Sequence, residues 1–213
     1  MKKSIVTALA ICFVSLAFAQ SDKYISAMKA NITQLDSIYQ KNNAAELANH
    51  FIRIGDAEKT QWLPYYYAAY CTVVQAYGGQ DNSQKDAMAD KATELITKAE
   101  TILGKENSET NVIKSMIASA HLMVDPQSRY MTYGPESSEW IKKAETLDAT
   151  NPRPILLEAQ NKFYTPEAFG GGKEVAKPLF EKAAKMFEIF KPETDLSPVW
   201  GKASVDYFLA QYK

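Results

Sequence analysis

"EWIKKAETLDATNPRPILLEAQNKFY", residues 139–164, decides the fold that this sequence predicts. Two helical runs flank the turn "DATNPRP" at residues 148–154, where asparagine and two prolines interrupt the helical pattern. Similar turns recur along the chain. The segments between them are rich in Ala, Glu, Lys, Leu and Gln, and they show little of the two-residue alternation of strands. The sequence therefore predicts an all-α protein.

One spacing pattern occurs in four of these segments: a small residue, a large apolar residue four positions on, and a small residue three further. Steps of four and three stay on one helix face, where small residues let a neighbouring helix approach closely. The copies are similarly spaced along the chain, and each follows another helical run, at 22–40, 61–77, 111–124 and 155–164. The four copies are Ala48-Ile52-Gly55, Ala92-Ile96-Ala99, Ser137-Ile141-Ala144 and Ala176-Phe180-Ala183.

The pattern predicts about four antiparallel helix pairs stacked as an α-solenoid, because a stack buries apolar faces that one pair cannot. A capping helix is expected at residues 198–212. An unrelated helical bundle is the alternative.

The stretch quoted above resembles a tetratricopeptide-type segment, and "VAKPLFEKAAKMF" at 175–187 resembles the second helix of such a repeat. Two features depart from that family: Ala149 stands where it usually has proline, and the repeat here is longer than the family's period of roughly 34 residues. The chain is similar to small exported tetratricopeptide-like proteins of Gram-negative bacteria. This resemblance implies a binding or assembly role rather than chemistry.

Residues 1–19 have the composition of a secretory signal peptide. Lys2 and Lys3 precede an apolar run that ends in Ala17-Phe18-Ala19, which predicts cleavage after Ala19. A retained anchor, or lipid attachment at Cys12, is the alternative. Residues 20–213 are then expected to form a single TPR-like domain in the periplasm or outside the cell. Cys71 is the one cysteine left in that domain, and its apolar helical surroundings predict a buried thiol.

Charge and motifs argue against several classes of function. Lys and Arg together number 24 and Asp and Glu 25, and loss of residues 1–19 removes only Lys2 and Lys3 from this balance, so there is no electrostatic reason to expect nucleic acid. No second long apolar run follows, so we expect no stable membrane insertion. His50 and His121 have no partner at ligand spacing, which predicts no metal site. We expect no cofactor, and no catalytic motif is present.

The stretch "YTPEAFGGGK" at residues 164–173 contains the one candidate phosphate loop. Gly172-Lys173 is followed by Glu174 rather than Ser or Thr, so the P-loop pattern fails. We instead expect the glycines to reverse the chain between two helices. Phe169 is expected to pack this turn on the stack, and a contact site is the alternative.

Aromatic residues gather in "TQWLPYYYAAYCTVVQAY", residues 60–77. Consecutive tyrosines point around a helix, so they cannot all face one core, and tyrosine is favoured at recognition sites. In arrays of this type the first helix of each pair lines the concave face. We therefore predict that Tyr67 and Tyr70 line a binding groove, while Tyr66, Ala69 and Val73 face the stack. Tyr130 and Tyr133 are expected in an inserted loop over the same groove. The alternative is that these aromatic rings fill gaps between helices.

These observations favour a non-catalytic exported protein that binds a protein or peptide partner, or a small solute, in its helical-repeat groove. The alternative is a periplasmic accessory protein that holds solutes for a transporter. An enzyme without a recognisable motif is the third reading.

Overall fold

The computed structural model describes residues 22–79 and 81–212, and within these residues it contains helices and no strand. The expected signal peptide lies outside them. The elements, in chain order, are α2 (Asp22–Ile32), the 3₁₀ turn η1 (Leu35–Ser37), α3 (Ile38–Lys41), α4 (Ala44–Glu58), α5 (Leu63–Gly78), α6 (Asn82–Leu103), α7 (Ser108–Leu122), α8 (Pro126–Leu147), α9 (Arg153–Tyr164), the 3₁₀ turn η2 (Glu167–Phe169), α10 (Lys173–Ile189) and α11 (Lys202–Ala210). The all-α prediction is confirmed.

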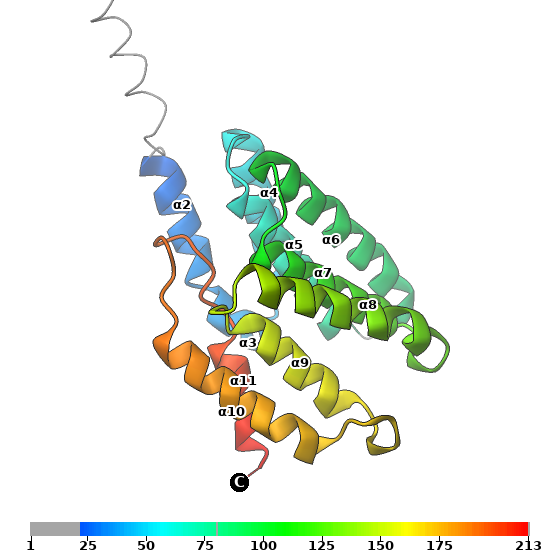
Figure 1. Cartoon of the computed structure of the whole chain (residues 1–213). Helices are drawn as coiled ribbons and strands as arrows, with labels where there is room; N and C mark the ends of the chain where they lie inside the picture. Colours follow the sequence, from blue (N-terminus) through cyan, green and yellow to red (C-terminus); the bar gives the residue numbers. More distant parts are fainter. Residues whose placement is uncertain (1–21, 80, 213) are drawn as a thin grey trace, which may run out of the picture.

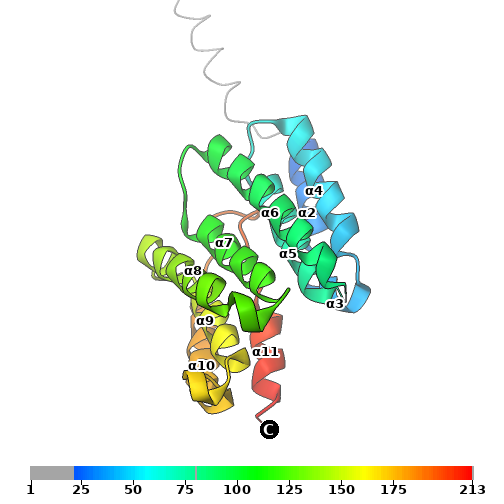
Figure 2. The same cartoon turned by 90° about the vertical axis from the view of Figure 1, so that its right-hand side faces the viewer.

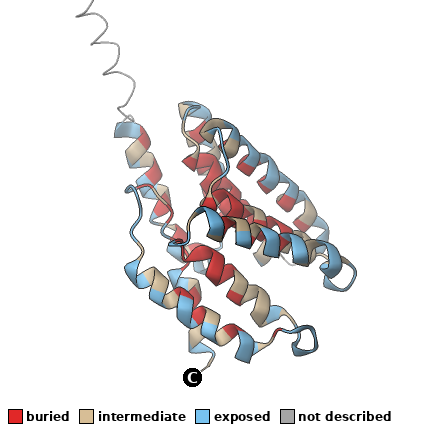
Figure 3. Ribbon diagram, viewed as in Figure 1, coloured by how far each residue is buried: buried red, intermediate tan, exposed pale blue. Residues whose placement is uncertain are grey.

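Successive long helices pack against one another from α4 to α11. Helices α4 to α7 occupy one end of the molecule, and α9, α10 and α11 lie together at the other (Figures 1 and 2). Helices α5, α7 and α9 are buried over most of their surface or on a broad face and carry about half of the buried residues, whereas α6, α8 and α10 each expose one face (Figure 3). The apolar face of each outer helix is therefore covered by an inner one.

The four copies of the spacing pattern face these helix contacts. All of their residues are buried except Ile52, which is half-buried. Gly55 shows why small residues are needed, because a Cβ atom there would lie 2.7 Å from the ring of Tyr65 on α5. Only glycine allows this ring to approach so closely.

One boundary prediction is wrong: residues 126–136 form the first half of α8 rather than a loop. Asp125 caps the helix by accepting a hydrogen bond from the Ser128 amide, and Pro126 occupies the first turn, where its missing N–H costs nothing. Pro135 lies inside the helix, where it cannot donate to the carbonyl of Met131. Met131 is 80% exposed, so water can satisfy that carbonyl and the helix continues.

The chain between α10 and α11 runs back across the molecule. Residues 191–201, which we call the strap, extend from the end of α10 to the side of α2 and return to α11 (Figure 1). Leu196 and Trp200 of the strap are buried in the main core, together with residues of α2, α4, α5, α6 and α7. A second, smaller core joins α9, α10 and α11.

Among the described helices, none is both long enough and apolar enough to span a membrane.

Candidate functional site

The strap covers the two tyrosines that were expected to line an open groove. Tyr67 is 0% exposed, and its hydroxyl donates a 2.8 Å hydrogen bond to the Leu196 carbonyl. Tyr70 is 5% exposed and stacks on Trp200 with ring centroids 4.3 Å apart. The expectation that Tyr67 and Tyr70 are open to a groove is therefore wrong for this structure. Their role in binding stays a prediction.

A buried polar network anchors the strap. The guanidinium of Arg153, at the start of α9, donates to the Pro198 carbonyl and, at 2.8 Å, to the Glu109 carboxylate. The hydroxyl of Tyr66 donates to Glu109 and accepts from the Trp200 indole N–H at 2.9 Å. Burial, with Glu109 nearby, raises the pKa of Tyr66 well above its ordinary value. Tyr66 is thus part of the packed interior, as the sequence predicted.

Tyr130 and Tyr133 lie on the N-terminal half of α8 rather than in a loop. Tyr133 stacks on His121 with centroids 5.0 Å apart, and Tyr130 lies 6.2 Å from the ring of Phe169. Tyr67 and Tyr70 thus contact the strap, whereas Tyr130 and Tyr133 contact Phe169 and His121. The two pairs have different neighbours, and their shared role in binding remains a prediction.

The glycine loop is a chain reversal. Gly170 and Gly172 have φ angles of +77° and +103°, in the left-handed region that favours glycine. At Gly171 a Cβ atom would lie 2.2 Å from the Thr165 carbonyl oxygen. The expected packing of Phe169 is wrong, because its side chain is 69% exposed. The Gly172 amide bond to the Lys162 carbonyl closes the turn without it.

Candidate metal ligands are dispersed. The described residues contain no group of three or more His, Cys, Asp or Glu side chains that could hold an ion. His121 is hydrogen-bonded to Asp86 and His50 to Asn31. Cys71 is fully buried, as predicted, and burial raises the pKa of its thiol.

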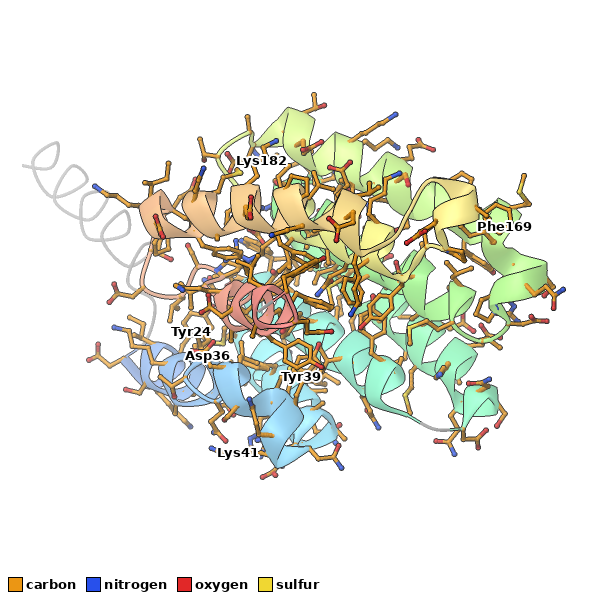
Figure 4. All side chains as sticks on the ribbon, turned by 90° about the horizontal axis from the view of Figure 1, so that it is seen from below. Tyr24, Asp36, Tyr39, Lys41, Phe169 and Lys182 are labelled. Carbon is orange, nitrogen blue, oxygen red and sulfur yellow. The ribbon has the colours of Figure 1, made fainter. Side chains whose placement is uncertain are left out.

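Three exposed tyrosines, one each from α3, α9 and α11, form a different candidate site, which we call the tyrosine strip. They are Tyr39 on α3, Tyr164 at the end of α9 and Tyr207 on α11, with exposed fractions of 55%, 72% and 66%. Tyr164 and Tyr207 both make edge contacts with the buried ring of Phe208, at 6.0 and 5.4 Å. Figure 4 shows Tyr39 on the side of α3 that faces α11.

The pKa values of Tyr39 and Tyr164 are consistent with neighbouring phenols. Burial and then the Tyr164 phenol raise the pKa of Tyr39 to about 12, and burial and then Tyr207 raise the pKa of Tyr164. The raised pKa values keep the phenols of Tyr39 and Tyr164 protonated at neutral pH, so these two side chains offer uncharged aromatic surface edged by hydroxyl groups.

A pocket of about 360 Å³ opens between α2 and the strap. Its lining combines two apolar side chains with one threonine and three charged side chains. The lining residues are Lys29, Ile32, Thr33, Asp36, Asp195 and Val199.

Sequence reasoning missed the strip because its members come from three separate segments. Tyr39 follows the buried Ile38 in "IYQK" and Tyr207 precedes the buried Phe208 in "DYF", and this looks like the ordinary edge of a helix. The strip becomes visible only when α3, α9 and α11 are brought together.

No family model matches the chain, and no curated protein matches it by sequence. A search of solved structures matches the HusA haemophore from Porphyromonas gingivalis, with 36% sequence identity and a TM-score of 0.79. The match covers 92% of this chain and 96% of that one. The chain belongs to the family of this haemophore. A haemophore is a binding protein rather than an enzyme, and the helical fold of HusA extends over nearly the whole of the present chain.

Proposed function

We propose that this chain is a non-catalytic, exported protein that binds haem or a closely related flat macrocycle on the tyrosine strip. The relationship to the HusA haemophore supports the ligand class, and the strip supplies a surface that suits it. A flat conjugated ring gains most from aromatic side chains that can stack on its face or meet its edge. Tyr39, Tyr164 and Tyr207 are exposed together, whereas the aromatic rings of α5 are covered by the strap.

The phenols of the strip belong to one of the side-chain types that hold haem iron. Haem iron in proteins is held by His, Cys, Met or Tyr. His50 and His121 are held by Asn31 and Asp86, and Cys71 is buried. A phenol of the strip would have to lose its proton to bind iron, which the raised pKa values of Tyr39 and Tyr164 oppose. Stacking is therefore expected to supply most of the affinity.

We further propose that the helix pairs form a tetratricopeptide-like array whose concave side is partly filled by the strap. Residues 1–19 are proposed as the export signal, and 20–213 as one domain that delivers its ligand to a protein partner. An intact mass that begins at Gln20 would support export and cleavage, whereas a mass that retains Met1 or carries acyl chains on Cys12 would contradict it.

The binding proposal is tested by titrating haem into the exported protein and following its visible absorption. Replacing Tyr164 and Tyr207 together by alanine removes two stacking partners of about 0.5–1.5 kcal/mol each, so we expect the dissociation constant to rise about tenfold. The matched control is Tyr130→Ala, since Tyr130 is a partly exposed tyrosine outside the strip. Equal affinity in all three proteins would refute the site, and no binding by the wild type would refute the function.

A further inference from the structure

An ion pair between two residues that line the pocket joins α2 to the strap. The Lys29 ammonium on α2 lies 2.6 Å from an Asp195 carboxylate oxygen on the strap. The two residues are 166 positions apart in sequence, and both side chains are largely open to solvent, at 47% and 79% exposure. An exposed pair of this kind contributes little to stability, so holding the strap in place does not by itself account for it.

The pocket and the strip border the same part of the interior. The pocket is lined by Asp36 and Val199, which lie three residues before Tyr39 and one residue before Trp200. Trp200 stacks on Tyr70, whose pKa is raised by burial and, in addition, by the nearby Tyr39 and Asp36. A flat ligand on the strip therefore has the pocket, with Lys29 at its rim, on the α2 side.

We propose that Lys29 binds a carboxylate of the ligand, and that Asp195 occupies this carboxylate position when no ligand is present. This inference rests on the proposed function, because haem carries two propionate groups at one edge of an otherwise apolar ring. Lys29 has a long, flexible chain that can turn from one carboxylate to another, and the exchange conserves one ion pair. The hydrogen bond from Lys29 holds the pKa of Asp195 below its usual range, so the Asp195 carboxylate is ionised at neutral pH.

The other charges of the pocket fix where the ligand carboxylate lies. Asp36 also lines the pocket and repels an anion placed near it, so the ligand carboxylate is expected on the Lys29 side. The carboxylate is then expected at the rim, with the ring edge against Ile32 and Val199. Val199 is 47% exposed and available for this contact.

The test compares haem with its dimethyl ester, which keeps the ring and loses both charges. In the Asp195→Asn background, where no ion pair has to be broken first, we expect Lys29→Gln to weaken haem binding about two- to fivefold and to leave ester binding unchanged, because an exposed ion pair is worth this much. Asp195→Asn removes the competing carboxylate, so it should tighten haem binding by a similar factor and leave the ester unaffected. Lys202→Gln is the matched control, since Lys202 forms an exposed pair with Asp206 on α11 and does not line the pocket.

Each outcome separates the two proposals. Wild-type protein that binds neither haem nor ester overturns the proposed function. Protein that binds both, but with no selective effect of Lys29→Gln on haem in the Asp195→Asn background, overturns the carboxylate site alone, as does an equal effect of Lys202→Gln in that background. Unchanged melting temperatures of the variants would show that the affinity changes arise at the site.

Discussion

Asp86 holds three helices together through one carboxylate. The residue belongs to α6. Its carboxylate accepts hydrogen bonds from Arg129 of α8 at 2.6 and 2.8 Å and pairs with the His121 ring of α7 at 2.8 Å. The Arg129 hydrogen bond, followed by that of His121, lowers the Asp86 pKa from 3.8 to about 2. The N-terminal half of α8, which carries exposed Tyr130 and Met131, depends on this cluster for its attachment.

The lowered pKa of Asp86 predicts an acid-sensitive contribution to stability. Because the folded-state pKa is below the unfolded one, the contribution is fully present above about pH 4 and is lost as the pH falls towards 2. We expect about 1 kcal/mol, since the carboxylate is 37% exposed and screening reduces the full linkage value. Denaturant melts should show Asp86→Asn less stable than wild type at pH 7, with the gap narrowing below pH 4. Asp90→Asn, at a 73% exposed carboxylate 3.7 Å from His121, should change little. A gap that stays constant from pH 7 to 2 would contradict this role.

At the scale of helices, sequence reasoning succeeded where a pattern depends on one helix and its nearest neighbour. The spacing in Ala92-Ile96-Ala99 reports a face that must meet another helix, and that face is buried. It failed at α8, because Gly134 and Pro135 usually end helices and the exposure that lets this helix continue is not visible in the sequence. It also failed for Tyr67 and Tyr70, because the strap that covers them lies far away along the chain.

Close helix contact makes a prediction for Ala99 of α6. This residue is 0% exposed, so leucine there must displace neighbouring side chains or backbone and should cost about 1–3 kcal/mol of unfolding free energy. Ala87 is exposed on the same helix, and Ala87→Leu provides the control for helix propensity and added apolar surface. Chemical denaturation of both variants measures the difference. Equal stability of the two would mean that α6 is not closely packed at Ala99.

At the scale of the whole molecule, the strap connects the main core and the smaller core. Without it, the packing of each helix on the next along the chain would join these two cores only through α9. The main core includes Leu196 and Trp200, although most of its other members come from the helices before α9. The smaller core of α9, α10 and α11 contains the Phe208 ring that supports Tyr164 and Tyr207. The tyrosine strip spans both parts, since Tyr39 belongs to α3. Its geometry therefore depends on how firmly the strap holds the two cores together.

Trp200 carries most of that connection and gives the corresponding prediction. Its indole stacks on Tyr70, donates to the Tyr66 hydroxyl and lies against the Arg153 guanidinium. Trp200→Ala should cost about 3–5 kcal/mol, as expected for truncating a buried aromatic side chain. Because the lost contacts are those between the two cores, hydrogen exchange should accelerate more in α10 and α11 than in α5. Haem affinity should fall as well, since Tyr39 would no longer be held opposite Tyr164.

Val199→Ala, at the exposed neighbouring residue, should leave the exchange pattern as in wild type. If Trp200→Ala instead lowered protection equally in α5, α10 and α11, the two cores would unfold as one unit and the strap would not be what couples them. The geometry of the tyrosine strip would then depend on the packing of α9 against α7 and α8.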